Sequence, residues 1–217
     1  EILALDDGSS DGSPAVLRRY AANCPQIRIF TQKNAAPGAA RNTALKNARG
    51  KYIMFCDSDD MFKPSICREM AQIMENENVD FAFCDTEEYK KKVQTSHIRK
   101  AGMTDISPND FPEIAVGIWC FIFRRDILEK YEIYFPSTFY GEDFAFAAKY
   151  IFISRRFCAL DKKLYVLRSR NDSLMRSLVV GGDNPRMLGN MDALADMYDF
   201  LVDCGLTNIC RGRFLRV

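Results

Sequence analysis

Short apolar runs alternate with amphipathic segments along the first hundred residues. Four runs have the length and the apolar, β-branched or aromatic content of buried strands: Ile2–Leu5, Ile27–Phe30, Tyr52–Cys56 and Phe81–Cys84. Segments with a helical spacing of apolar residues separate them, and Pro14 suits the first turn of one such helix. This alternation predicts an α/β fold in which helices flank a mostly parallel sheet.

The pattern also predicts a strand and helices in the second half of the chain. A strand is expected over Ile118–Phe123, a short helix near 126–131 and a longer helix over about 142–153. Near the end, five apolar residues fall on one face of a helix, and we interpret this stripe as core packing: Met187, Met191, Leu194, Tyr198 and Leu201. We expect one domain over 1–176, whose second half is small and mixed, and a C-terminal helical extension over 177–217.

The composition is that of a globular protein, and it narrows the function. The chain has 217 residues, of which 47% are hydrophobic, and its net charge of +1 lacks the basic excess of a nucleic-acid binder. His97 is the only histidine, so neither a histidine-rich zinc site nor a Ser-His-Asp triad can be assembled. No apolar run approaches the ~18–20 residues of a membrane span.

Eight cysteines are scattered along the chain without a CxxC pair. Several lie inside apolar runs, where a thiol behaves as a small hydrophobic side chain, so we expect them to be reduced and buried. Reduced thiols favour the cytoplasm. We therefore expect a cytoplasmic protein, and peripheral association with the inner face of the cytoplasmic membrane stays open.

Three acidic clusters fall where loops are expected. Asp6-Asp7 and Asp57-Ser58-Asp59-Asp60 each follow a predicted strand, and Glu142-Asp143 opens a predicted helix. Carboxylates on loops at the ends of buried strands suit hard cations such as Mg²⁺ or Mn²⁺, which often share their ligands with substrate phosphates. Aspartate is also common in turns and at helix N-termini, so a purely structural interpretation of each cluster stays open.

Three segments together resemble family 2 glycosyltransferases of the GT-A fold: Asp6–Ser13, Gly38–Asn42 and Phe55–Asp60. Their order, spacing and strand context all match that family. Downstream, Phe123–Leu128 and Gly141–Phe144 look like its acceptor-side half, especially in members that build bacterial surface polysaccharides. The resemblance covers 1–176 and implies a Rossmann-like GT-A architecture.

The resemblance also implies roles for residues on the donor side. Asp6 and Asp7 would contact the nucleoside, and Arg41 would line the donor pocket. Asp57 would approach the ribose or the metal, and Asp59 would bind the Mn²⁺ or Mg²⁺ ion that bridges the donor's diphosphate. Asp60, next along the chain, would be either a supporting residue or an alternative ligand.

On the acceptor side, the resemblance implies that Asp143 is the general base. The reaction would move a sugar from a nucleotide-sugar donor to a hydroxyl group of a saccharide or lipid-linked acceptor. The donor would be a UDP-sugar, which the resembling family often uses. Direct attack by that hydroxyl group would invert the anomeric centre. The alternative is that Glu142-Asp143 merely complements the dipole of its helix.

Three further side chains carry open alternatives. Trp119 is expected either to stack on a sugar or to lie in the core. Arg168 and Arg170 are expected either to close over a diphosphate or to lie on the surface.

The chain departs from the family pattern at its start, because Glu1 begins what resembles the second strand of the family's sheet. We therefore expect an N-terminally truncated domain, which leaves a non-catalytic, nucleotide-binding domain as one alternative. A phosphohydrolase with Asp57 as nucleophile and Asp59 as acid and base is another. That alternative leaves Asp6-Asp7 unexplained, and Met61 stands where such enzymes usually carry Thr or Val.

Overall fold

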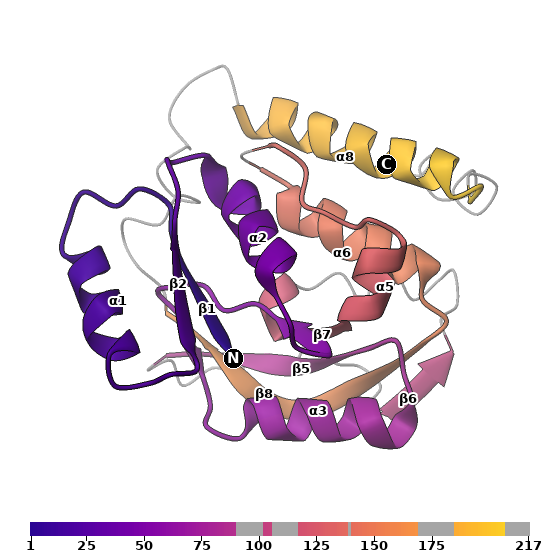
Figure 1. The fold of residues 1–217 in the computed structure, drawn as a ribbon. Coiled ribbons are helices and arrows are strands. Elements are labelled where there is room, and N and C mark those ends of the chain that lie inside the picture. The colour runs from indigo at the N-terminus through magenta and orange to yellow at the C-terminus, as the bar shows by residue number, and fades with distance from the viewer. Residues whose placement is uncertain (90–101, 106–116, 139, 169–184, 207–217) are drawn as a thin grey trace.

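The computed structural model of the chain describes residues 1–89, 102–105, 117–138, 140–168 and 185–206 (Figure 1). Helices lie on both faces of the larger of two sheets, and one long helix forms an outer layer. The predicted α/β architecture is confirmed.

A parallel two-stranded sheet with two helices forms the N-terminal part. Strand β1 (Ile2–Asp6) pairs with β2 (Ile27–Thr31) in a parallel register that joins Ile2 to Ile27 and Asp6 to Thr31. Helices α1 (Ser13–Ala21) and α2 (Ala36–Asn47) follow the two strands, and each has a proline in its first turn. Both strands therefore end at the same edge of the sheet, where the loop that begins with Asp7 lies.

A six-stranded sheet forms the centre of the molecule, with the order β3-β7-β5-β8-β4 and with β6 paired to β8. Its strands are β3 (Tyr52–Met54), β4 (Met61–Phe62), β5 (Phe81–Glu88), β6 (Gly102–Asp105), β7 (Phe121–Arg124) and β8 (Arg156–Leu167). The long β5–β8 pairing is parallel, whereas the four shorter pairings are antiparallel.

Two predicted strands have different bounds in the structure. The run that starts at Tyr52 leaves the sheet after Met54, and Phe55 turns its ring into the core. The run that starts at Ile118 opens as a 3-10 turn over Ile118–Cys120 before β7 begins. Apolar runs mark burial in both cases, but burial alone does not fix where backbone pairing starts.

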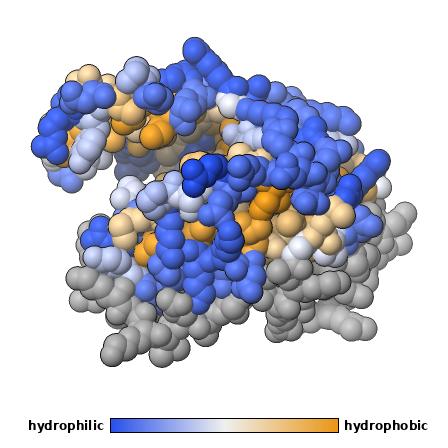
Figure 2. All heavy atoms as spheres, turned by 90° about the horizontal axis from the view of Figure 1, so that it is seen from below, coloured by the Kyte–Doolittle hydropathy of each residue, from blue (hydrophilic) through white to orange (hydrophobic). Residues whose placement is uncertain are grey.

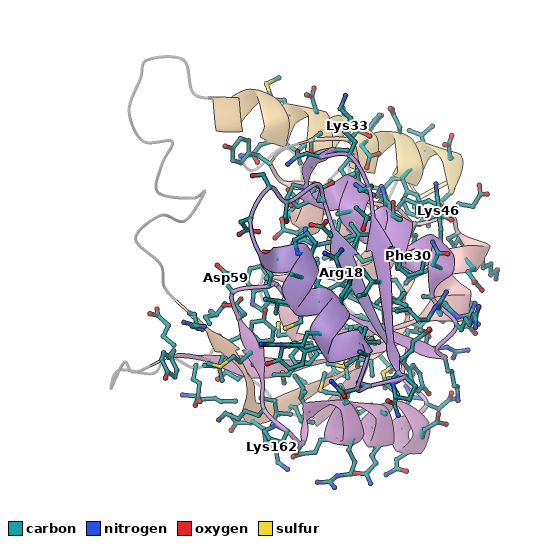
Figure 3. The ribbon with its side chains drawn as sticks, turned by 60° about the vertical axis from the view of Figure 1, so that its left-hand side comes forward. Arg18, Phe30, Lys33, Lys46, Asp59 and Lys162 are labelled. Carbon is teal, nitrogen blue, oxygen red and sulfur yellow. The ribbon has the colours of Figure 1, made fainter. Side chains whose placement is uncertain are left out.

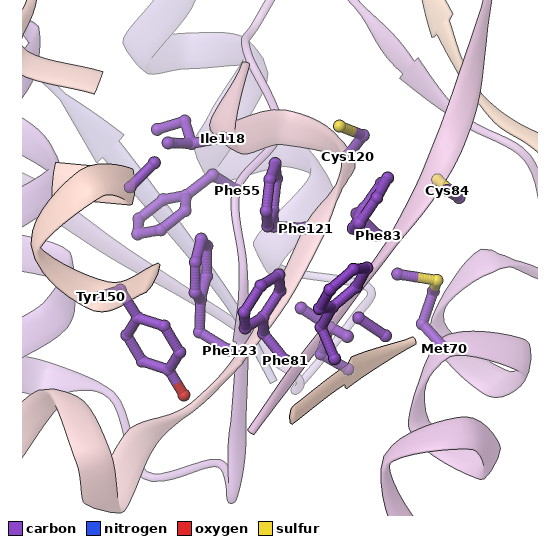
Figure 4. Close-up of a cluster of buried hydrophobic side chains, with 14 of the residues drawn as sticks. Phe55, Met70, Phe81, Phe83, Cys84, Ile118, Cys120, Phe121, Phe123 and Tyr150 are labelled. Atoms are coloured by element: carbon purple, nitrogen blue, oxygen red, sulfur yellow. The ribbon is translucent and has the colours of Figure 1, made fainter. Parts of the chain in front are cut away.

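Aromatic rings fill the core between the sheet and its helices (Figure 4). The ring centroid of Phe121 on β7 lies 5.7 Å from that of Phe81 on β5 and 5.4 Å from that of Phe123 on β7. Helix α3 (Ile66–Glu77) lies on one face of the sheet, and α5 (Arg125–Lys130) and α6 (Glu142–Ile153) lie on the other. Each buried ring adds roughly 1.5–3 kcal/mol of hydrophobic stabilisation, so the core fixes α6 firmly.

The predicted reduced state agrees with the described cysteines, since each of the seven is free. Their predicted burial holds for Cys84, Cys120 and Cys158, whereas Cys56 and Cys67 are exposed. The face in Figure 2 is mostly hydrophilic, and its hydrophobic residues lie in separate small groups. Within the described ranges, no helix has both the length and the apolar content to cross a membrane.

Helix α8 (Pro185–Asp203) packs on α6 with a face that matches the predicted stripe only at Leu201. The buried side chains are Ala193, Met197 and Leu201, whereas Met191 and Tyr198 of the predicted stripe are 60% and 52% exposed. Leu194 is also exposed, and the side chain of Met187 lies outside the described residues. The small side chains Ala145 and Ala148 receive the buried face on α6.

An ion pair fixes the rotation of α8. Lys149, on α6, is 5% exposed, and its Nζ donates to Asp196 Oδ2 at 2.6 Å and to the Tyr134 carbonyl oxygen at 2.8 Å. A buried ammonium group needs both partners, because desolvating an unpaired charge is costly. The pair turns Asp196 towards α6, and with it the neighbouring Ala193 and Met197.

We expect Asp196→Ala to lower the free energy of unfolding by about 1–3 kcal/mol, because it leaves the Lys149 ammonium group buried with a single acceptor. The melting temperature should fall by about 3–10 °C. The control is Asp199→Ala, which makes the same change at an exposed position of α8. Equal melting temperatures for the two variants would contradict a stabilising role for the ion pair.

Candidate active site

Arg41 stands at the centre of the candidate site, between two acidic side chains. From α2, its Nη2 donates to Asp57 Oδ1 at 2.9 Å and its Nη1 donates to Glu142 Oε1 at 3.1 Å. The guanidinium also lies 5.4 Å from the ring centroid of Phe135. A planar guanidinium group can serve two carboxylates and an aromatic face at once. Arg41 therefore joins the acidic loop after β3 to the start of α6, where Glu142 lies 101 residues after Arg41 in the chain.

Close packing places α2 against the segment before α6. A Cβ atom on Gly38 would lie 3.0 Å from the Pro136 carbonyl oxygen and 3.2 Å from Phe135 Cβ, so only glycine fits without a shift. Asn42 donates from Nδ2 to the Phe135 carbonyl oxygen and accepts the Phe135 N–H at Oδ1, both at 2.9 Å. Gly38 and Asn42 thus dock the helix that carries Arg41.

The four residues of the acidic loop differ in what they contact. Asp60 uses both carboxylate oxygens, because Oδ2 accepts from the Tyr165 hydroxyl group and Oδ1 accepts from the Arg168 N–H, each at 2.8 Å. Asp59 lies at the margin of the molecule in Figure 3. In the part of the chain that the structure describes, its carboxylate has neither a hydrogen bond nor an ion pair. Asp57 has one oxygen bound to Arg41.

Asp57 and Asp59 are the two acidic side chains of the loop whose carboxylates keep an oxygen without a hydrogen bond among the described residues, and their role as metal ligands stays a prediction. Mg²⁺ is commonly bound by one or two carboxylates, with substrate phosphates and water completing its coordination. No three His, Cys, Asp or Glu side chains among the described residues could hold an ion together.

Asp143 stands in the first turn of α6. Gly141, with φ +74°, turns the chain into this helix, and a Cβ atom there would lie 2.9 Å from Asn190 Oδ1 of α8. The Asp143 carboxylate is half-buried and accepts the N–H of the next residue at 2.8 Å. Its negative charge acts on both Arg41 and Glu142. The candidate base therefore belongs to the same charged cluster as Asp57.

Burial and charge shift the pKa values of the two buried partners. Burial disfavours the charged form of Arg41, but the nearby Asp57, Glu142 and Asp143 outweigh it, so its pKa is raised. Burial also raises the pKa of Glu142, and the charge of Asp143 adds to that effect. Arg41 lowers the pKa of Glu142, but this effect does not cancel the rise caused by burial and by Asp143. The cluster keeps Arg41 charged and makes the ionised form of Glu142 costly.

Asp6 and Asp7 are engaged by the protein itself. Asp6 is buried, and its Oδ1 accepts the Ser9 N–H at 3.1 Å. Asp7 Oδ1 accepts from Gln32 Nε2 at 2.8 Å and from the Ala35 N–H at 3.1 Å. Both carboxylates shape the loop after β1 and the approach to α2. Their contact with a nucleoside stays a prediction.

Sequence reasoning missed two residues that organise the site. Glu142 was expected only as part of an acidic pair, and it proves to be the buried partner of Arg41. Tyr165 lay in the segment that resembles the end of the family's domain, with no signal that its hydroxyl group contacts a loop 105 residues earlier. Trp119 is half-buried with its ring centroid 6.4 Å from that of Tyr165. Arg170 lies outside the described residues.

The α/β fold, with acidic residues after β1 and after β3, is that of GT-A glycosyltransferase structures. Residues 1–349 of TarS from S. aureus in complex with UDP-GlcNAc match with a TM-score of 0.76 and 22% identity, over 98% of this chain and 64% of that one. The mannosyltransferase PcManGT from Pyrobaculum calidifontis, in complex with GDP-Man and Mn²⁺, matches with a TM-score of 0.60 and 17% identity, over 94% of this chain and 66% of that one. These likenesses show the fold.

The sequence shows the family. The profile described as glycosyl transferase family 2 matches residues 1–132, and the chain belongs to that family. The Escherichia coli (strain K12) protein named uncharacterized glycosyltransferase YibD is 28% identical over 198 residues. The match covers 85% of this chain and 57% of that protein, so the chain spans little more than half the length of this relative.

We expect the stability of Glu142→Gln, relative to the wild type, to rise as the pH increases above 4.5, the ordinary pKa of a glutamate. Because the pKa of Glu142 is raised on folding, the folded state binds the proton more tightly than the unfolded state. Wild-type stability therefore falls as pH rises through the folded pKa, whereas glutamine stays uncharged. Melting temperatures measure the difference, and Glu77→Gln at the exposed end of α3 is the control. A pH-independent difference would show that Glu142 titrates normally.

Proposed function

We propose that the chain is a glycosyltransferase domain that moves a sugar from a UDP-sugar to a hydroxyl group of a saccharide or lipid-linked acceptor, with inversion at the anomeric carbon. The observation that carries the proposal is the ion-pair network of Arg41, which joins Asp57 on the donor side to Glu142 beside Asp143. Membership of glycosyl transferase family 2 supports the same activity. The expected setting is the synthesis of a bacterial surface glycan in the cytoplasm.

Each residue then has a chemical task. The acceptor oxygen attacks the anomeric carbon, the bond from that carbon to the diphosphate oxygen breaks, and the Asp143 carboxylate takes the hydroxyl proton. Arg41 holds the loop of Asp57 against the helix that carries Asp143, so donor and base stay in fixed relation. Asp57 and Asp59 would hold a Mn²⁺ or Mg²⁺ ion, which offsets the charge that develops on the leaving diphosphate.

The solved structures named above support the choice of donor and metal in this proposal. One contains UDP-GlcNAc, and the other contains GDP-Man with Mn²⁺. A pair of carboxylates without a third protein ligand among the described residues suits an ion that arrives with a diphosphate. We therefore propose that metal and donor bind together and that neither binds strongly alone.

A thermal-shift screen of UDP-sugars and GDP-sugars tests the donor and the metal together. We expect one UDP-sugar with Mn²⁺ to raise the melting temperature by about 5–10 °C at roughly 100 times its Kd, since a ligand of the folded state stabilises it. Mn²⁺ or the nucleotide sugar alone should give much smaller shifts. Asp59→Asn should abolish the metal-dependent part, whereas Asp203→Asn, at the end of α8, should keep it.

Three outcomes, one of this screen and two of activity assays beside it, would count against the proposal. Equal shifts in melting temperature with and without Mn²⁺ would show that the donor binds without the metal. Stabilisation by nucleotide without any release of UDP from a UDP-sugar would favour the alternative of a non-catalytic, nucleotide-binding domain. Release of phosphate from p-nitrophenyl phosphate, lost in Asp57→Asn, would favour the phosphohydrolase alternative.

Asp143→Asn tests the base. We expect donor affinity to stay within about twofold of the wild type, and turnover of the UDP-sugar to fall by roughly 10²–10⁴-fold, which is the usual contribution of a general base. UDP release measures turnover, with saccharide acceptors and with water alone. Asp192→Asn, on the exposed surface of α8, is the control. Near-normal turnover in Asp143→Asn would remove this residue from the mechanism.

A further inference from the structure

The end of β8 holds the acidic loop at two points. The Asp57 N–H donates to the Tyr165 hydroxyl oxygen at 3.2 Å, and that hydroxyl group donates to Asp60 Oδ2 at 2.8 Å. The Arg168 N–H donates to Asp60 Oδ1 at 2.8 Å. One tyrosine therefore contacts both ends of the loop, and the strand beyond it binds the last aspartate.

Packing fixes the position of the tyrosine ring itself. Tyr165 is 0% exposed, and its ring centroid lies 5.6 Å from that of Phe62 and 6.4 Å from that of Trp119. Strand β4 follows the loop directly and pairs with β8, so that Phe62 lies opposite Tyr165 and Met61 opposite Val166. The hydroxyl group thus has a rigid base from which to orient the loop.

The loop closes on itself as well. The Asp60 N–H donates to the Asp57 carbonyl oxygen at 3.1 Å. With both carboxylate oxygens of Asp60 bound by the protein, only Asp57 and Asp59 retain oxygens that have no hydrogen bond within the described chain. A site with so few protein ligands depends strongly on how well they are held before the ion arrives.

We infer that Tyr165 and Asp60 form a clamp that holds Asp57 and Asp59 ready for the metal and the diphosphate. Asp60 is then a positioning residue and not a ligand, and Tyr165 acts through the loop without touching the donor. The inference rests on the proposed function, because it assigns residues to the same metal-dependent site. It predicts that the clamp sets metal affinity more than the rate at saturating metal.

Tyr165→Phe on the chain of 217 residues is the direct test, because it keeps the ring and removes only the hydroxyl group. Mn²⁺ binding is followed by electron paramagnetic resonance at saturating UDP. We expect affinity for Mn²⁺ to fall by about 10-fold or more, as residues that orient metal ligands typically affect it. Affinity for UDP without metal, and turnover of the UDP-sugar at saturating Mn²⁺, should stay within about threefold.

The matched control is Tyr52→Phe, which removes a hydroxyl group that donates to Glu75 Oε1 at 2.9 Å on an exposed surface. Its affinity for Mn²⁺ should equal that of the wild type. Trp119 is the only tryptophan and lies beside Tyr165, so an unchanged emission spectrum of Tyr165→Phe without metal verifies that the local packing is kept.

Comparing the Mn²⁺ affinities of Asp60→Asn and Asp59→Asn distinguishes a residue that positions the loop from a residue that binds the metal. Loss of a ligand should abolish Mn²⁺ binding, whereas loss of the clamp should only weaken it. Equal loss in both variants, or Mn²⁺ affinity of Tyr165→Phe within about twofold of the wild type, would overturn the inference while the proposed function stands. A wild-type chain that binds UDP but no Mn²⁺ would overturn both.

Discussion

The buried guanidinium of Arg41 is the constraint on which the rest of the site depends. Its two carboxylate partners come from opposite halves of the chain, one after β3 and one at the start of α6. A charged side chain that is only 18% exposed is tolerable only when it is paired. Asp57 and Glu142 therefore have to stay where they are, and Asp143 stays next to them.

The packing around that ion pair explains residues that do no chemistry. Gly38 lets α2 approach the segment before α6, and Asn42 binds both backbone groups of Phe135. The Phe135 ring lies under Arg41 and stacks on Phe146 of α6, with centroids 4.0 Å apart. Polar and aromatic contacts thus hold the same three segments together.

Local signals in the sequence predicted much of this and missed what depends on distance along the chain. The helix over 142–153 has the expected bounds, because its apolar spacing and acidic first turn are local features. The place of β7 between β3 and β5 has no local signal, since an apolar run indicates burial and not its neighbours. The buried face of α8 was predicted correctly at Leu201 but wrongly at Met191, Leu194 and Tyr198, because the exposed face also carries apolar residues.

The two halves of the charged cluster differ in how a cation would affect them. A cation bound by Asp57 competes with Arg41 for the same negative charge, since Asp57 Oδ1 is the atom that Arg41 binds. Glu142 lies at the start of α6 and not on the acidic loop, so a cation bound by Asp57 would not compete directly for the Glu142 carboxylate. An ionised Glu142 would then leave Arg41 with a counter-charge if a cation engaged Asp57.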